Sequence, residues 1–337
     1  YLKTTNDPRW PGHKLIENTY IIFTSDNGGM EGHPGEIITD NYPLDRGKIS
    51  AMEGGTRVPL IITGPGIPKG VESDVMVNGL DFYPTLLTLT GTPLPKQKNL
   101  DGSDLSELLL RDPINPDLVK DKDGRTRDTM VWHFPHSVAL ESTIRVGGYK
   151  LVRNYNHRYD KGTTELELYH LYEKVKDRQV RVDIEEANNL ASSKPDLAKE
   201  LNNKLSSILQ EMDASYPYYN PQANKVGADK KMVPKVNSHK RVNDQVVFQY
   251  IENGAKVIRG DLIYTLNGGN RYEEWDRLKA GKKNNREIRF TLPSGTTHYF
   301  LNLIDENNFL VSYPATPDYS ELSKTKKQFS EHGIINK

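Results

Sequence analysis

The sequence contains no cysteine. This absence excludes disulfide bonds, thiolate nucleophiles and zinc sites built on thiolate ligands. It also removes the sequence signal that distinguishes an oxidising from a reducing compartment. Long apolar runs are also missing, because no stretch approaches the roughly 20 residues that a membrane helix needs. The opening residues 1–14 have neither the apolar segment nor the cleavage site of a signal peptide. We therefore expect no membrane partner and a fold stabilised by packing.

An excess of one charge is the third missing feature. Lys and Arg total 45, Asp and Glu total 45, and the formal net charge is +0. No overall field steers the protein toward nucleic acid, so we expect no nucleic-acid partner. What is present is a chain of 337 residues, 35% of them hydrophobic, which is long enough for two or three packed units. Any charged ligand must be bound by local groups.

The first part of the chain, residues 1–119, predicts an α/β order. An apolar run at 20–24 is stopped by Asp-Asn-Gly-Gly, which predicts a buried strand that ends in a loop. A second such run, at 58–63, is closed by Gly-Pro-Gly. Asp81 can cap a following helix over 82–89. Strand, loop, strand and helix in this order favour an α/β fold class.

The rest of the chain predicts two further units. Residues 120–221 read as an α+β subdomain, in which an antiparallel sheet is packed by one helix that begins near Pro195. A Pro-, Asn- and Lys-rich linker is expected at 222–236. Residues 237–315 predict an all-β sandwich-like unit, and residues 316–337 a polar tail.

Asp26 and Asn27 are the first candidate ligands, because they follow directly on an apolar strand. Open α/β sheets place ligands at the ends of their strands. A carboxylate beside a side-chain carbonyl suits calcium or magnesium, and the two following glycines let the backbone approach an ion closely. Asp-Asn-Gly-Gly is also a common turn, and the four residues alone leave both interpretations open.

A dense series of motifs follows this loop. They are Asn41-Tyr-Pro-Leu-Asp-Arg-Gly-Lys48, Glu53-Gly-Gly-Thr-Arg57-Val-Pro59, Asp81-Phe-Tyr-Pro-Thr-Leu-Leu87, Leu100-Asp-Gly-Ser103, Ile144-Arg-Val-Gly-Gly-Tyr-Lys150 and Glu167-Leu-Tyr-His-Leu171. In this order the series resembles the type I sulfatases over roughly residues 15 to 221. The resemblance implies the C-terminal part of an alkaline-phosphatase-like sulfatase domain.

The resemblance implies roles for three residues of the loop region. Asp26 and Asn27 match two ligands that the family gives to one Ca²⁺ ion, and Lys48 matches a lysine that contacts the sulfate. The expected chemistry agrees, since a divalent ion and an ammonium group stabilise the charge that spreads over sulfate oxygens in the transition state. The alternative for Lys48 is a solvated surface lysine.

Two arginines and a glutamate in the same motifs are harder to assign. Arg46 is a candidate for anion binding, although Asp45 is inserted where the family has Leu-Arg-Gly, which puts the register in doubt. Glu53 and Arg57 suit a structural ion pair that fixes the loop, and direct contact with substrate is the alternative.

Three histidines are further candidates for substrate binding. His133 and His136 belong to a Trp-His-Phe-Pro-His motif, which resembles a motif near the pocket mouth of such sulfatases. His33 lies in the loop after Asp26. Packed or surface positions are equally compatible with all three.

The sequence lacks the Cys/Ser-x-Pro/Ala-x-Arg signature that sulfatases convert to formylglycine, and it lacks the Asp-Asp pair that completes their calcium site. In the family order both belong upstream of Tyr1, so we expect this chain to be a fragment that is inactive alone and has the missing N-terminal half as its partner. A noncatalytic derivative is the competing explanation. Bare strand edges would need such a partner to stay soluble.

Three functions remain in competition. The first is a sulfatase that acts on a sulfated oligo- or polysaccharide and that is periplasmic or secreted, as the resemblance implies. The second is a phosphatase or phosphonate hydrolase of the same superfamily. The third is a noncatalytic polysaccharide-binding module, with Tyr264, Tyr272, Trp275 and Tyr299 as a stacking surface, although aromatic residues in a small sandwich usually form its core.

Overall fold

The computed structural model describes residues 1–36, 38–136, 139–175, 178–223, 226–279, 282–315 and 329–335. The chain forms two compact units, Tyr1–Ser215 and Tyr216–Lys337. The fold is mixed α/β with several antiparallel sheets and few helices. Among the described helices, none combines the length and the apolar character required to cross a bilayer. Most of the predicted tail at 316–337 lies outside the described residues.

Unit 1 begins with a two-stranded ribbon. β1 (Ile21–Thr24) and β2 (Leu60–Thr63) form where strands were predicted, but they pair antiparallel, with Ile21 opposite Thr63. The prediction of a buried strand is wrong for β1, because Phe23 is 62% exposed. The apolar pattern shows that the strand can be buried but does not show what covers it, and in the described chain no third strand pairs with β1.

The helices of this part of unit 1 are α1 (Glu53–Thr56), α2 (Phe82–Leu89) and α3 (Ser106–Leu110), and 3-10 turns occupy Leu15–Asn18, Gly79–Asp81 and Pro116–Leu118.

The side chain of Asp81 does not cap α2, although the sequence predicts that it does. The Asp81 carboxylate is fully buried and accepts hydrogen bonds from Arg127, at 2.6 and 2.8 Å. It also accepts from the backbone N–H of Ser103 at 2.8 Å. A partner 46 residues away along the chain uses the carboxylate that local reasoning gave to the helix terminus.

The α+β part of unit 1 has the predicted hairpin order. β3 (Thr129–Phe134), β4 (Glu141–Val146), β5 (Tyr149–Asn154) and β6 (Leu166–His170) form an antiparallel sheet in the order β3-β4-β5-β6. α4 (Pro195–Glu211) follows, with Pro195 in its first turn as predicted. A short ribbon, β7 (Tyr172–Val175) with β8 (Arg178–Arg181), lies between the sheet and this helix along the chain.

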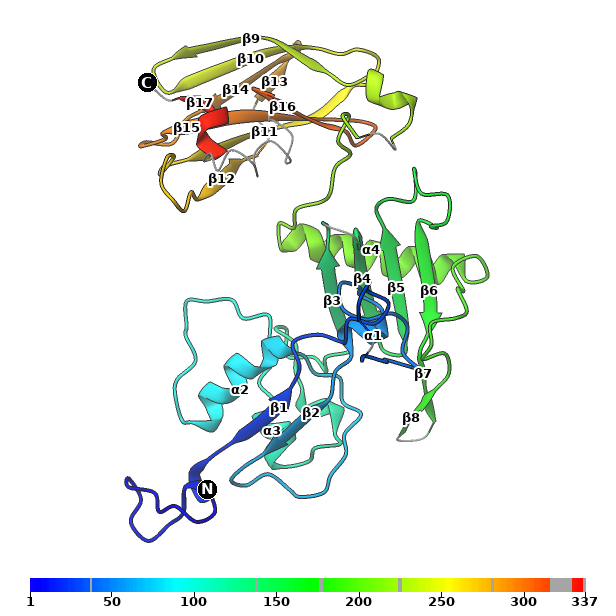
Figure 1. Ribbon diagram of the computed structural model, residues 1–337, viewed down its shortest axis with the longest axis vertical. Coiled ribbons are helices and arrows are strands. Elements are labelled where there is room, and N and C mark those ends of the chain that lie inside the picture. The colour runs from blue at the N-terminus through cyan, green and yellow to red at the C-terminus, as the bar shows by residue number, and fades with distance from the viewer. Residues whose placement is uncertain are drawn as a thin grey trace. The chain divides into compact units, whose positions relative to one another are not determined.

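The two faces of this sheet have different partners. Side chains alternate along a strand, so Lys150 and Arg153 of β5 point to opposite faces. Arg153 donates to Asn202 of α4 at 2.7 Å, whereas Lys150 donates to Glu53 of α1 at 3.1 Å. α4 therefore covers one face and the loop that contains α1 packs on the other, as Figure 1 shows.

Unit 2 is built from two antiparallel sheets around one apolar core. One sheet has the order β13-β14-β10-β9, and the other has the order β12-β11-β15-β16, with β17 also paired to β15. The bounds are β9 Lys235–Val242, β10 Gln245–Ile251, β11 Val257–Thr265, β12 Trp275–Leu278, β13 Lys282–Asn284, β14 Glu287–Thr291, β15 His298–Asp305, β16 Leu310–Tyr313 and β17 Ile334–Ile335, with 3-10 turns at Ala228–Lys231 and Phe329–His332. β9 begins inside the predicted linker.

The aromatic residues considered for sugar stacking are mostly used in the core of unit 2. Tyr299 is completely buried, and Tyr264 packs against the same core cluster. Trp275 is half-buried, with its ring centroid 5.4 Å from that of Phe300. Only Tyr272 of the four is exposed, at 75%. The hypothesis of a sugar-stacking surface formed by all four rings is therefore wrong, because the alternation of side chains along the strand directs Tyr299 into the core.

Candidate functional site

Three loops of unit 1, residues 26–29, 45–48 and 52–55, interlock through backbone hydrogen bonds. The bonds run from Gly28 N to Gly55 O at 2.9 Å, from Lys48 N to Gly29 O at 2.8 Å and from Gly54 N to Asp45 O at 2.9 Å. The Asp-Asn-Gly-Gly loop is thus fixed by the two motifs that follow it in the sequence. We call these three segments the loop cluster.

Glycine is required where the loops meet. A Cβ atom at Gly28 would overlap the carbonyl oxygen of Gly54, and one at Gly54 would overlap the carbonyl oxygen of Arg46. These neighbours are backbone atoms, which cannot rotate away as a flexible side chain can. The Gly-Gly pairs of both motifs therefore allow the close backbone approach on which the loop cluster depends.

Asp26 and Asn27 lie at the tip of the first loop. The Asn27 amide nitrogen donates to Asp26 Oδ1 at 2.6 Å, and the Ser25 hydroxyl donates to the Asn27 carbonyl at 2.8 Å. Both residues line a cleft of about 1430 Å³ in unit 1, with β2, α1, β3 and Tyr172 among its other walls. The pair thus lies at the wall of this cleft, where its side chains can offer oxygen ligands.

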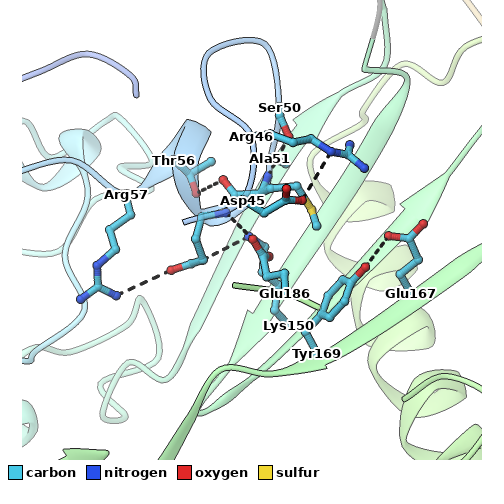
Figure 2. Close-up of polar contacts among 12 residues, drawn as sticks. Asp45, Arg46, Ser50, Ala51, Thr56, Arg57, Lys150, Glu167, Tyr169 and Glu186 are labelled. Carbon is cyan, nitrogen blue, oxygen red and sulfur yellow. Dashed lines mark hydrogen bonds and ion pairs between the residues drawn. The ribbon is translucent and has the colours of Figure 1, made fainter. Parts of the chain in front are cut away.

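A buried ionic cluster lies directly behind α1. Lys150 is fully buried, and its Nζ is 3.1 Å from Glu53 Oε1 and 2.8 Å from Glu186 Oε1. Figure 2 shows Lys150 and Glu186 beside the loop that carries Ala51 and Thr56. The second oxygen of Glu186 accepts from the backbone N–H of Glu53 at 2.7 Å. One buried ammonium group thus serves two buried carboxylates.

Two arginines flank this cluster on opposite sides (Figure 2). Arg57 NH1 is 3.6 Å from Glu53 Oε2, the structural ion pair that was preferred from the sequence, and it also donates to the Tyr172 hydroxyl. Arg46 NH1 is 3.9 Å from Glu141 Oε2, and Glu141 accepts from the backbone N–H of Ala51. Each arginine therefore neutralises a carboxylate that holds the α1 loop.

Burial and charge act in opposite directions on the carboxylates of the cluster. Burial raises the pKa of Glu186 from 4.5 to about 7, against the opposing charge of Lys150. Burial also acts to raise the pKa of Glu53, but the charges of Lys150 and Arg145 outweigh it and the pKa is lowered. Burial raises the pKa of Glu141 as well. Glu53 therefore keeps its negative charge beside Lys150, whereas burial favours the protonated form of Glu186.

Comparison with known proteins assigns this region to a family. The sulfatase family model matches residues 13–92, which include the whole loop cluster. A sulfatase of Formosa agariphila is 32% identical over 254 residues, 68% of this chain and 40% of that protein. Canine arylsulfatase K is 27% identical over 216 residues, 62% of this chain and 35% of that protein. This chain belongs to the sulfatase family.

Two further matches complete the comparison. Porcine N-acetylgalactosamine-6-sulfatase is 30% identical to this sulfatase-family chain over 138 residues, 41% of the chain and 24% of that protein. A solved structure from work on glycosaminoglycan metabolism by Bacteroides thetaiotaomicron is 26% identical, covers 58% of this chain and 39% of that chain, and has a TM-score of 0.39. A TM-score this low establishes no common fold. The chain spans about two fifths of the length of the Formosa relative.

The donor set of the sulfatase-family loop fits part of a calcium site. The carboxylate of Asp26 and the amide oxygen of Asn27 are hard ligands of the kind that calcium prefers. Calcium takes six to eight oxygens, however, and the described residues contain no group of three acidic or histidine side chains placed to hold a metal. Asp26 and Asn27 would therefore supply two ligands of a larger set.

Lys48 and Arg46 occupy different positions around the loop cluster. The backbone of Lys48 is bonded to Gly29, so the structure brings this lysine to the Asp26 loop, with an exposed side chain. The Arg46 side chain is 54% exposed and turns toward Asp45 and Glu141. Neither residue is among the described residues that line the cleft.

The structure does not gather the three predicted histidines around Asp26. His133 borders the cleft, but its Nδ1 lies 2.5 Å from the Ser142 hydroxyl and its Nε2 lies 2.7 Å from the carbonyl oxygen of Ser215. These partners place its ring on the face of the sheet that α4 covers. His136 is exposed and packs on Phe134, with ring centroids 4.4 Å apart, and His33 is half-buried in its loop.

Sequence reasoning missed Lys150, Glu186 and Glu141 as determinants of this site. Lys150 closes the Gly-Gly-Tyr-Lys motif, which was noted only for its resemblance to the family. A lysine within a strand of buried apolar residues was the available signal, because a buried lysine needs a partner. The identity of that partner had no local signal, since Glu53 is 97 residues away in the chain.

The raised pKa of Glu186 predicts a pH-dependent stability. Between about pH 4.5 and 7 the folded state binds more protons at Glu186 than the unfolded state does, so its contribution falls as pH rises. At each pH we compare the unfolding free energy of wild type with that of Glu186→Gln. We expect this difference to fall by about 3 kcal/mol between about pH 4.5 and pH 7. Urea unfolding from pH 4.5 to 8 measures it. The exposed variant Glu173→Gln should leave the profile unchanged, and parallel profiles of wild type and Glu186→Gln would contradict the shift.

Proposed function

We propose that the protein containing this chain hydrolyses sulfate esters of carbohydrates, with a Ca²⁺ ion bound in part by Asp26 and Asn27. One observation carries the proposal: the Asp26-Asn27 tip lies on the cleft within the segment that matches the sulfatase family. The interlocked glycine backbone beneath this tip supports a preorganised site, because it leaves the loop little freedom to move.

The residues of this chain would divide the chemistry between them. Bound calcium would supply Lewis-acid stabilisation of the negative charge on the sulfate oxygens. Asp26 and Asn27 would hold and orient the ion, and Lys48 would bring an ammonium group to the same anionic head. We infer that the formylglycine nucleophile lies in a part of the protein upstream of Tyr1, so that this chain alone is inactive.

The substrate class is inferred from the relatives and from the cleft. One relative is named an N-acetylgalactosamine-6-sulfatase, which acts on a sulfated sugar by name. The proposed substrate is therefore a sulfated oligo- or polysaccharide, and its sulfate would lie at the Asp26-Asn27 end of the cleft. His33, Arg46, His133 and His136 remain proposed substrate-binding residues. A periplasmic or secreted location is part of this proposal.

The exposed apolar surface of the β1–β2 ribbon supports a further part of the proposal. Phe23 of β1 is 62% exposed, and Ile61, which lies opposite it on β2, is 61% exposed. We propose that the N-terminal half of an alkaline-phosphatase-like domain covers this ribbon and completes the calcium site. Such coverage would remove an apolar patch and an open strand edge, both of which favour aggregation.

Turnover by the complete gene product tests this function. We expect release of sulfate from sulfated sugars, at least about 100-fold faster than release of phosphate from matched phosphate esters, because one metal and one ammonium group suit a singly charged ester head. Addition of a calcium chelator should abolish the activity, and added calcium should restore it. Preferred turnover of phosphate esters would instead support a phosphatase, and binding of polysaccharide without turnover would support a binding module.

A further inference from the structure

A continuous chain of contacts joins β5 to the candidate calcium loop. Lys150 of β5 is bonded to Glu53, which opens α1. Gly55 of the same turn accepts the hydrogen bond from Gly28, the residue that follows Asn27. Each link is a direct contact. The backbones of Gly28 and Gly54 are in such close contact that α1 and residues 26–29, the candidate calcium loop, cannot shift closer together. The position of α1 thus sets the position of the calcium loop.

α1 cannot hold this position without help from the sheet. It has only four residues, and a helix this short is unstable alone because nucleation is costly. Its first N–H group is bound by the Glu186 carboxylate, and the preceding Ala51 N–H is bound by Glu141. Lys150 links Glu186 and Glu53, so one ammonium group from the sheet fixes both the backbone and the side chain that begin α1.

We propose that Lys150 is a positioning residue for the calcium site: it holds α1, and α1 holds the Asp26-Asn27 loop in its ligating position. This inference rests on the proposed function, since it concerns the metal site of that reaction. Lys150 is bonded to Glu53 and Glu186, and it acts on Asp26 and Asn27 through these carboxylates and the loop cluster. Residues that orient metal ligands in this way typically change metal affinity 10- to 100-fold when they are replaced.

The test is calcium titration of the complete gene product by calorimetry, well below its melting temperature. Lys150→Met removes the ammonium group and keeps most of the side-chain volume. We expect it to raise the calcium dissociation constant about tenfold or more. The double variant Lys150→Met/Glu186→Gln keeps an acceptor oxygen for the Glu53 N–H and is neutral at position 186 at every pH. It should recover part of the lost affinity.

Leu205→Ala is the matched control for a general loss of stability. Leu205 is fully buried in α4, on the opposite face of the same sheet from Lys150. The substitution destabilises unit 1 by creating a cavity, but it breaks no link to the loop cluster. We expect its calcium dissociation constant to stay within about twofold of wild type, because its effect and that of the distant site are independent.

The outcomes separate this inference from the proposed function. Wild-type calcium affinity in folded Lys150→Met, or an equal loss in Leu205→Ala, overturns the positioning role. If Lys150→Met does not fold, the double variant decides, and wild-type affinity there also overturns it. Asp26→Ala is the reference for the site itself. If Asp26→Ala binds calcium as tightly as wild type, the proposed site is wrong, whatever Lys150 does.

Discussion

Replacement of Asp26 by alanine is expected to lower both calcium affinity and sulfate-ester turnover of the complete gene product by about 100-fold or more. Asp26 carries the only negative charge of the Asp-Asn-Gly-Gly loop. Because calcium sites depend on the charge of their oxygen ligands, its loss cannot be compensated by the neutral amide of Asn27. Asp26→Asn should show most of the same loss, since it keeps the shape and removes the charge.

The comparison with Lys48→Ala makes this prediction specific. Lys48 is proposed to contact the sulfate and not the metal, so its alanine variant should lose about 100-fold in kcat while calcium affinity stays within about twofold. Asp123→Ala, in a surface turn outside the loop cluster, is the control and should change neither quantity. Steady-state kinetics and calorimetry measure the two effects. Full turnover in both Asp26→Ala and Lys48→Ala would refute the assignment.

Replacement of Lys150 by methionine is expected to reduce the stability of unit 1 by about 3–5 kcal/mol at neutral pH. The ammonium group is fully buried between Glu53 and Glu186, so its removal leaves Glu186 without its cation and Glu53 with Arg57 as its remaining ion-pair partner. Glu186 can take up a proton because burial raises its pKa to about 7, whereas the pKa of Glu53 is lowered and its charge persists. The charge of Glu53 without Lys150 is the main source of the loss.

Hydrogen exchange of the β4 and β5 amides measures this loss in unit 1 alone, because the exchange of core strands reports the unfolding free energy of their own unit. Lys204→Met is the control. This lysine of α4 lies on the surface, with a side chain 43% exposed, and should cost less than about 1 kcal/mol. Equal losses in the two variants would mean that Lys150 contributes no more than a solvated lysine.

The strands and helices of this chain were largely predictable from local patterns. The four strands of the β3–β6 sheet and the start of α4 at Pro195 lie where periodicity and the proline placed them. Such elements follow from interactions between near neighbours in the chain, which a single sequence displays directly. Pairing direction and burial do not, which is why β1 was expected to be a buried strand and is exposed in an antiparallel ribbon.

By itself the sequence determined the family, through ordered motifs, and it determined Asp26 and Asn27 as candidate ligands, through their place after an apolar strand. The tertiary structure alone decided what holds those ligands. Glu53 contacts Lys150, which is 97 residues away in the chain, and Glu186, which is 133 residues away. His133 contacts Ser142 and Ser215. Contacts of this kind arise only when distant segments pack together and buried charges must find partners, and no local pattern encodes which partner that will be.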